Sequence, residues 1–246
     1  MSWSRAPLAA GAIALGLGAG WALSGRIVTV AILAVLLAAE NGYSKAYSPR
    51  GANSAASLAA DLPVGSLVRR VWLLAAYVLP AIIVWMTLGL LVNLLPLSAA
   101  ALVLMAGYGV FYGVLEAGGM ARPAPPGSRW QVPSGWVRGV SRRRRFVVWG
   151  SLLGPGFATR NPYAGFWLLP LAVAAVGNIG YGVLLAAALG AAHSTGRAVG
   201  LLRNVQDVDV NGYLQSALRS MYWRVADGFA LLAAAGAAAM TCAYRL

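Results

Sequence analysis

Charged residues are scarce in this chain of 246 residues, which has only 19 basic and 6 acidic side chains against 60% hydrophobic residues. From Val71 to Leu115 there is no Asp, Glu, Lys, Arg or His. At about 1.5 Å per residue, a helical stretch of this length is enough for two passes through the roughly 30 Å hydrocarbon layer of a bilayer. This composition excludes a large water-soluble domain and predicts an all-α, polytopic membrane protein with a helical hairpin at Val71–Leu115.

The sequence also has few residues that could bind a metal, take part in redox reactions or bind a nucleotide. Cys242 is the only cysteine and His193 the only histidine, which excludes a disulfide within the chain and a cysteine-based metal cluster. No P-loop, G-x-G-x-x-G or H-E-x-x-H motif occurs. The net charge of +13 is spread between apolar blocks and forms no single basic face. We therefore expect no cofactor, no metal, no nucleic-acid partner and no enzymatic activity.

Apolar blocks predict about seven membrane-spanning helices in a single transmembrane domain. They lie at residues 6–25, 27–44, 71–92, 97–115, 146–162, 163–202 and 225–244. We expect the first block to be retained and not cleaved as a signal peptide, because its n-region holds only Arg5 and its core is long and interrupted by glycines.

Basic residues in the connections predict the orientation. The three basic connections, at 45–70, 116–145 and 203–224, are expected in the cytoplasm. The N-terminus is then cytoplasmic as well, and the predicted location is the cell membrane, with membrane lipids as partners.

Residues 146–202 allow two arrangements. In the first, 146–158 dips into the membrane and returns, and two short spans follow with a turn at 177–180. In the second, 146–162 crosses fully, and one long kinked helix crosses back. The short first apolar segment favours the first arrangement.

The segment Gly154–Tyr163 predicts a broken helix, because two prolines and two glycines fall within nine residues. Broken helices at membrane depth often line a cavity, and their free N–H groups can hold an anion. The predicted substrate-binding residues are Thr159, Arg160, Asn161, Tyr163 and His193. The alternative is a tight interfacial turn in which Arg160 extends to the lipid surface.

Other ionisable residues near the spans have ordinary explanations. Glu40 and Glu116 are expected at the interface, and Asp227 is expected to pair with Arg224 at i,i+3 spacing. His193 opens the polar cluster that ends at Arg197, expected at the cytoplasmic end of its helix, where it acts as a proton relay or belongs to a capped helix end.

Two further patterns carry expectations about structure. Asp207–Gly212 matches the first half of a calcium loop, but Leu218 stands at position twelve, so a charged turn before an amphipathic surface helix explains it as well. The Ala-rich final block with Gly236 predicts close helix packing.

Three functions remain open. The first is a small transporter or permease component for a small anionic or amphipathic solute, with its site around Arg160. The second is a non-catalytic subunit that assembles a larger membrane complex, docking protein subunits through Trp130, Trp136 and Arg142. The third is a lipid-modifying membrane enzyme that uses Glu116 or His193 as a base.

Overall fold

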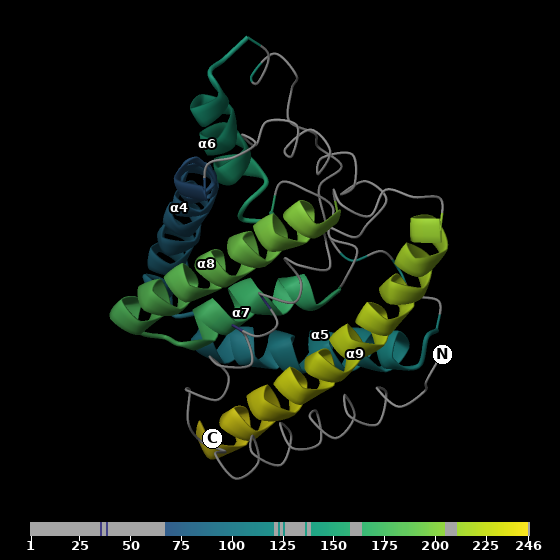
Figure 1. Cartoon of the computed structure of the whole chain (residues 1–246). Helices are drawn as coiled ribbons and strands as arrows, with labels where there is room; N and C mark the ends of the chain where they lie inside the picture. Colours follow the sequence, from purple (N-terminus) through teal and green to yellow (C-terminus); the bar gives the residue numbers. More distant parts are fainter. Residues whose placement is uncertain are drawn as a thin grey trace.

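The described part of the chain consists of helices joined by turns, with no strands (Figure 1), as expected. The computed structural model describes residues 67–120, 139–157, 164–204 and 211–245, with isolated residues at 35, 38, 123, 125 and 136. In the predicted span 27–44 only Val35 and Ala38 are described, and both are helical. The predicted span 6–25 and Glu40 lie outside the described residues.

The elements in the described ranges follow one another along the chain as shown in Figure 1. They are α4 (Leu67–Asn93), α5 (Ser98–Ala117), α6 (Arg142–Leu152), the 3-10 helix η3 (Ala164–Trp167), α7 (Leu168–Ala175), α8 (Ile179–Asn204) and α9 (Asn211–Arg245). In this part of the chain α4, α5 and α9 contain segments long and apolar enough to cross a membrane: Val68–Asn93, Ser98–Ala117 and Arg224–Ala243. These coincide with three of the predicted spans, and the count of seven stays a prediction.

The uncharged stretch forms the two helices that its sequence predicts, and each packs mainly on a helix from later in the chain. After α4 ends, a turn at 94–97 leads into α5, yet α4 packs mainly along α8 and α5 along α9. At the end of α4 the Asn93 side-chain amide donates to the carbonyl oxygens of Gly89, at 2.9 Å, and Val173, at 3.1 Å. This contact ties the end of α4 to α7.

Glycines explain why α5 and α9 pack closely on each other. On the α5 and α9 interface, a Cβ at Gly109 would lie 2.8 Å from the Leu231 carbonyl oxygen, and one at Gly228 would overlap the backbone nitrogen of Ala117. These two glycines let the backbones approach closely. A Cβ at Gly236, in the Ala-rich block, would meet no atom of the described residues within 4 Å, so the close packing expected there stays a prediction.

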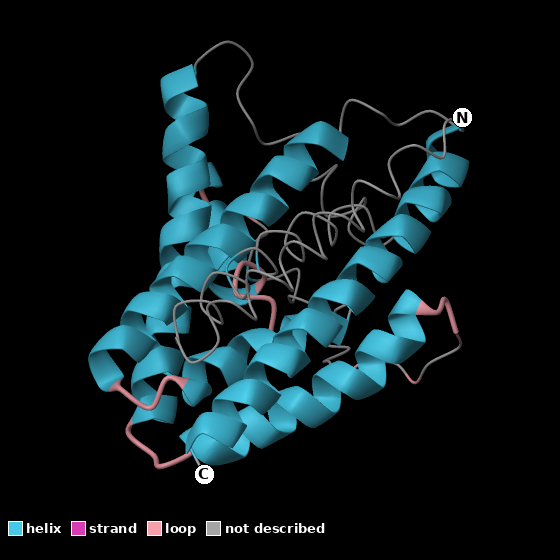
Figure 2. Cartoon of the chain, turned by 90° about the horizontal axis from the view of Figure 1, so that it is seen from below, coloured by secondary structure: helices cyan, strands magenta, loops and turns pink. Residues whose placement is uncertain are grey.

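The described residues between 142 and 204 bear on one part of the two arrangements, the turn near residue 177. A turn at Val176–Asn178 separates α7 from α8, and Gly177 has a φ of +64°, which favours glycine. An uninterrupted helix over residues 163–202 is therefore excluded, and the path of residues 146–162 through the membrane stays a prediction. The 11 residues of α6 span only about 16 Å, too short to cross the hydrocarbon layer. Figure 2 shows the two turns, 94–97 and 176–178, near the C-terminus at one end of the molecule.

The last helix corrects two expectations. α9 runs unbroken from Asn211 to Arg245, so the predicted surface helix and the last span are one helix. No glycine or proline interrupts it between Tyr213 and Asp227. Positions five to twelve of the partial calcium loop belong to this helix, which excludes a calcium loop of that type.

Candidate functional site

Three buried ionisable side chains contact the first three residues of η3. The Ala164 N–H donates to Glu116 Oε1 at 3.2 Å, and the Gly165 N–H donates to Asp227 Oδ2 at 2.8 Å. The ring centroid of Phe166, the third residue of η3, lies 5.4 Å from that of His193. These three groups come from α5, α9 and α8, and each is fully buried.

The carboxylates suit this place because the first N–H groups of a helix have no partner within the helix. A helix N-terminus also carries a partial positive charge, which favours an acidic side chain beside it. The Tyr108 hydroxyl donates to the Ala164 carbonyl oxygen at 2.9 Å, so α5 holds Ala164 through both its N–H and its C=O. The start of η3 is thereby fixed against α5 and α9.

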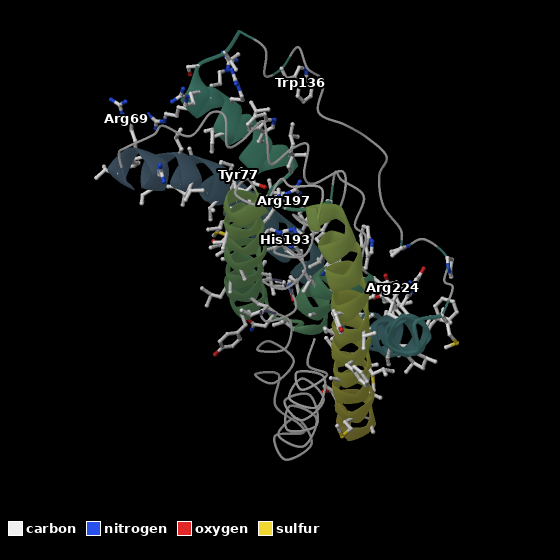
Figure 3. The ribbon with its side chains drawn as sticks, turned by 45° about the vertical axis from the view of Figure 1, so that its right-hand side comes forward. Arg69, Tyr77, Trp136, His193, Arg197 and Arg224 are labelled. Atoms are coloured by element: carbon white, nitrogen blue, oxygen red, sulfur yellow. The ribbon has the colours of Figure 1, made fainter. Side chains whose placement is uncertain are left out.

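The burial of both acids corrects the sequence interpretation. Glu116 was expected at the interface, yet its side chain has no exposed surface. Asp227 was expected to pair with Arg224. Its carboxylate instead accepts the Gly165 N–H, and Arg224 Nη2 donates to the Met120 carbonyl oxygen at 2.7 Å. Arg224 is labelled in Figure 3. Each acid lies within about one turn of the end of its apolar segment, which is why position along the sequence suggested an interfacial role.

At the other end of the break the chain is held by a basic side chain. Arg197 is only 4% exposed, and its Nη1 donates to the carbonyl oxygen of Leu153, the residue directly after α6, at 2.8 Å. A cation is favoured there because the C-terminus of a helix carries a partial negative charge. Tyr77 is also fully buried, and Figure 3 labels it together with Arg197 and His193. The sequence predicted Arg197 at a cytoplasmic helix end and missed this role.

His193 lies against the turn that follows α6. Gly156 has a φ of +89°, and a Cβ there would lie 2.8 Å from His193 Nε2 and 2.6 Å from a ring carbon of Phe166. The turn therefore needs glycine for both its conformation and its space. The predicted site residues Thr159, Arg160, Asn161 and Tyr163 lie outside the described residues. His193 contacts the described chain on both sides of them, at Gly156 and Phe166.

An aromatic cluster fills the space beside the break. It consists of Trp85, Phe157, Phe166 and Trp167, with ring centroids 4.8 Å apart for Trp85 and Phe157 and 5.3 Å apart for Phe157 and Phe166. The Trp85 indole N–H is buried and has no hydrogen-bond partner within the described part of the chain. Burying such a donor unpaired costs about 1–3 kcal/mol, so a polar ligand atom or a water would be stabilised beside it.

Together these contacts form what we call the clamped break. Its described parts are residues 153–157 and 164–166, and its clamps are Arg197, Glu116, Asp227 and His193. In the described ranges no three His, Cys, Asp or Glu side chains gather as a metal site would require. No protein-family model, curated protein or solved structure matches the chain.

The residues predicted to dock a partner are only partly described. Trp136 is 53% exposed and Arg142 is exposed at the start of α6. Trp130 lies outside the described residues.

Proposed function

We propose that the chain is a small multi-pass transporter or permease component of the cell membrane, with its N-terminus in the cytoplasm and its solute site at the clamped break. One observation carries this proposal. Two fully buried carboxylates, from two helices able to cross a membrane, hold successive N–H groups of an interrupted helix. Ionisable groups in membrane helices are costly and usually mark solute or proton pathways. Broken helices are common at the sites of transporters.

The polar contacts favour an amphipathic solute with a positive charge over an anion. The N–H groups of Ala164 and Gly165, which an anion would need, already donate to Glu116 and Asp227. Two carboxylates in a low-dielectric site repel an anion and attract a cation. The apolar part of such a solute would contact the aromatic cluster, where Trp85 also offers a face for a cation.

Transport in vesicles tests this proposal. The purified protein is reconstituted in liposomes, and the uptake of ethidium, an amphipathic cation, is compared with that of the anion carboxyfluorescein. We expect ethidium to enter faster than in protein-free vesicles, and carboxyfluorescein not to. Glu116→Gln and Asp227→Asn keep an oxygen that accepts the N–H group but remove the charge, so each should lower ethidium uptake roughly tenfold. Asp207→Asn, which removes one carboxylate from the predicted cytoplasmic connection, is the control.

The outcomes separate the site from its alternatives. Unchanged ethidium uptake in both carboxylate variants would remove the clamped break as the site. Carboxyfluorescein uptake that disappears in Arg160→Gln would instead support an anionic solute held by Arg160.

A non-catalytic subunit of a larger complex is the second candidate function, because the exposed Trp136 between α5 and α6 offers an aromatic contact for a partner. Under this candidate, vesicles with the isolated protein take up neither dye, and the chain purifies together with other subunits. A variant Trp136→Ser should then reduce their recovery, whereas it should leave ethidium uptake unchanged if the chain is a transporter.

A further inference from the structure

The indole N–H of Trp85, in the aromatic cluster beside the clamped break, is a buried donor without an acceptor in the described part of the chain. Trp85 belongs to α4, and its side chain has no exposed surface. We propose that this N–H binds an acceptor oxygen of the solute, so that the protein prefers an amphipathic cation with a carbonyl group near its charge. This inference rests on the proposed function and names the solute class of the same site.

The position of the N–H follows from the packing of Trp85 on α8. A Cβ at Gly190 would lie 2.8 Å from Trp85 Cδ1 and 2.9 Å from its Cβ, so the five-membered ring of the indole packs on the backbone of α8. Cδ1 is bonded to the indole nitrogen, which places the N–H on the same edge of the ring. The ring centroid of Phe157, directly after the Gly156 turn, lies 4.8 Å from that of Trp85. Trp85 therefore contacts both α8 and the break.

The polar groups of α8 beside Trp85 hydrogen-bond to each other. The buried Ser194 hydroxyl, one turn after Gly190, donates to the Gly190 carbonyl oxygen. Within a helix that oxygen also accepts the backbone N–H four residues later, so both of its lone pairs are in use. Trp85 forms no hydrogen bond with either group. Burying a donor without an acceptor destabilises the protein, and a ligand oxygen that accepts the N–H removes this cost.

The apolar surroundings of Trp85 favour a solute oxygen over a water molecule. A buried water typically makes about three hydrogen bonds to polar groups. The rings of Phe157 and Phe166, which pack on Trp85, have no polar atom to offer one. A carbonyl oxygen needs only the single donor, and the apolar part of the same solute can pack on the rings.

The acidic side chains lie close enough for one small solute to reach both groups. Gly165, whose N–H donates to Asp227, directly precedes Phe166, whose ring centroid lies 6.3 Å from that of Trp85. Neighbouring Cα atoms are about 3.8 Å apart. A solute in which a few bonds separate the charge from the carbonyl can therefore place one at Asp227 and the other at Trp85. A site with such a donor discriminates against an analogue that lacks the acceptor, because the donor then stays unpaired.

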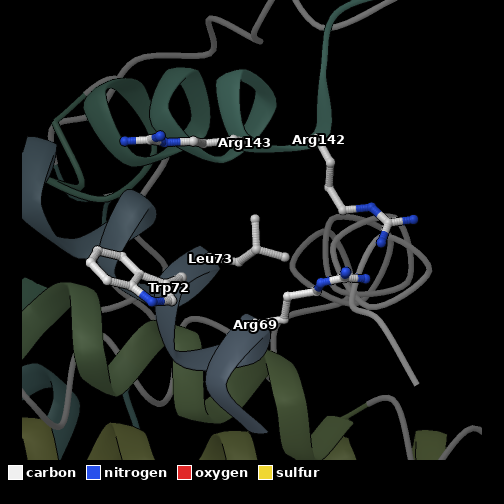
Figure 4. Close-up of a pocket in the computed structure, with 5 residues that line it drawn as sticks. All are labelled: Arg69, Trp72, Leu73, Arg142 and Arg143. Atoms are coloured by element: carbon white, nitrogen blue, oxygen red, sulfur yellow. The ribbon is translucent and has the colours of Figure 1, made fainter. Parts of the chain in front are cut away.

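Trp72, on the same helix, provides a contrast. It is 69% exposed and lines a pocket of about 580 Å³ at the first turns of α4 and α6 (Figure 4). At 1.5 Å per residue it lies about 20 Å from Trp85 along α4. Its exposed ring can hydrogen-bond to water or to lipid headgroups, so it makes no demand on the solute. Trp72 is therefore the control position.

Two probes of equal charge and chain length test the proposal on the protein in liposomes. Benzoylcholine contains a carbonyl oxygen, whereas (4-phenylbutyl)trimethylammonium has methylene groups in place of the ester. Each probe is added at increasing concentration, and the concentration that halves ethidium uptake is measured. The ratio of the two half-inhibitory concentrations is then compared between protein variants, so that the different hydrophobicity of the probes cancels.

The tryptophan variants locate the donor. In Trp85→Phe the ratio should shift about fivefold against benzoylcholine, because only this probe loses a hydrogen bond. Trp72→Phe should leave the ratio unchanged. Trp167→Phe alters the same aromatic cluster without removing the Trp85 N–H. It should change inhibition by both probes alike, and the ratio should stay within about twofold.

NMR of the unaltered protein in detergent gives a test that does not need Trp85→Phe to fold. The nine tryptophans give nine indole N–H signals when their nitrogen is isotopically labelled. Benzoylcholine should move one of these signals downfield, as formation of a hydrogen bond does. The phenylbutyl probe should leave that signal where it is.

Two results would overturn the hydrogen bond while ethidium transport stands. The first is the same ratio in the unaltered protein and in Trp85→Phe, with ethidium taken up by both. The second is no downfield shift at a benzoylcholine concentration that blocks uptake, and this result decides the matter if Trp85→Phe does not fold. If the unaltered protein takes up no ethidium, the proposed function itself fails, and the inference fails with it.

Discussion

The two ends of the helix break are held by opposite charges. Where α6 ends, the guanidinium of Arg197 binds the carbonyl oxygen of Leu153. Where η3 begins, the carboxylates of Glu116 and Asp227 bind two N–H groups. Each side chain opposes the partial charge that its helix end presents. Interrupting a helix within apolar surroundings therefore needs buried ionisable residues of both signs, and these come from other helices.

The two clamps differ in number and in origin. The basic clamp is one residue of α8, on the side of the molecule where α4, α6 and α8 pack. The acidic clamp is formed jointly by α5 and α9, which pack on each other. Two acids hold two adjacent N–H groups, so one can exchange its partner for a solute while the other still holds η3. Arg197 is the one described side chain that holds the Leu153 carbonyl, which makes the basic clamp structural.

The largest loss of stability is expected when both acidic residues are replaced. In the double variant Glu116→Ala/Asp227→Ala two buried N–H groups lose their acceptors, at about 1–3 kcal/mol each. We expect a loss of about 2–6 kcal/mol in the free energy of unfolding, or no folded protein. Chemical unfolding in mixed micelles measures it, with Glu116→Gln/Asp227→Asn as the control that keeps both acceptors. Equal stability of the two double variants would show that the hydrogen bonds do not hold η3.

Replacing Arg197 should cause the next largest loss of stability. Arg197→Met leaves the Leu153 carbonyl without its charged donor, a loss of about 1.5–3 kcal/mol. Arg197→Lys keeps a donor and the charge and should recover part of this loss. A cysteine at position 160, in a Cys242→Ser background, reports the state of the break through its rate of maleimide labelling. We expect Arg197→Met to raise that rate, and an unchanged rate would show that Arg197 does not hold the break.

Tightening the α5 and α9 interface tests whether the acidic clamp depends on helix packing. Gly228→Ala places a methyl group against the backbone of Ala117, next to Glu116, and should cost about 1–3 kcal/mol through overpacking. Gly236→Ala, on the same helix, adds its methyl group where no atom of the described residues lies within 4 Å and should cost less than about 0.5 kcal/mol. Thermal unfolding compares the pair directly. A similar cost for both would contradict the close approach at Gly228.

These contrasts also show what the sequence reveals about the fold and the site. The missing charges and the hydropathy predict the apolar segments of α4, α5 and α9, and the glycine at 177 predicts the end of α7. Glu116 is buried instead because α5 packs on α9. This packing depends on close contact between glycines about 115 residues apart in the sequence, such as Gly113 and Gly228, whose backbones come together only in the fold. Local spacing gives no sign of it, so both acids seemed interfacial.

A small effect on stability is expected for Asp227→Asn, and this variant separates holding η3 from binding a solute. The asparagine side-chain oxygen can still accept the Gly165 N–H, and the variant no longer buries a charge, so the free energy of unfolding should change by less than about 1 kcal/mol. Ethidium uptake should nevertheless fall roughly tenfold, because the carboxylate charge is gone. Uptake and thermal unfolding are measured on the same preparation. If stability and uptake fall together, Asp227 acts through the fold alone; if stability holds while uptake falls, its charge meets the solute.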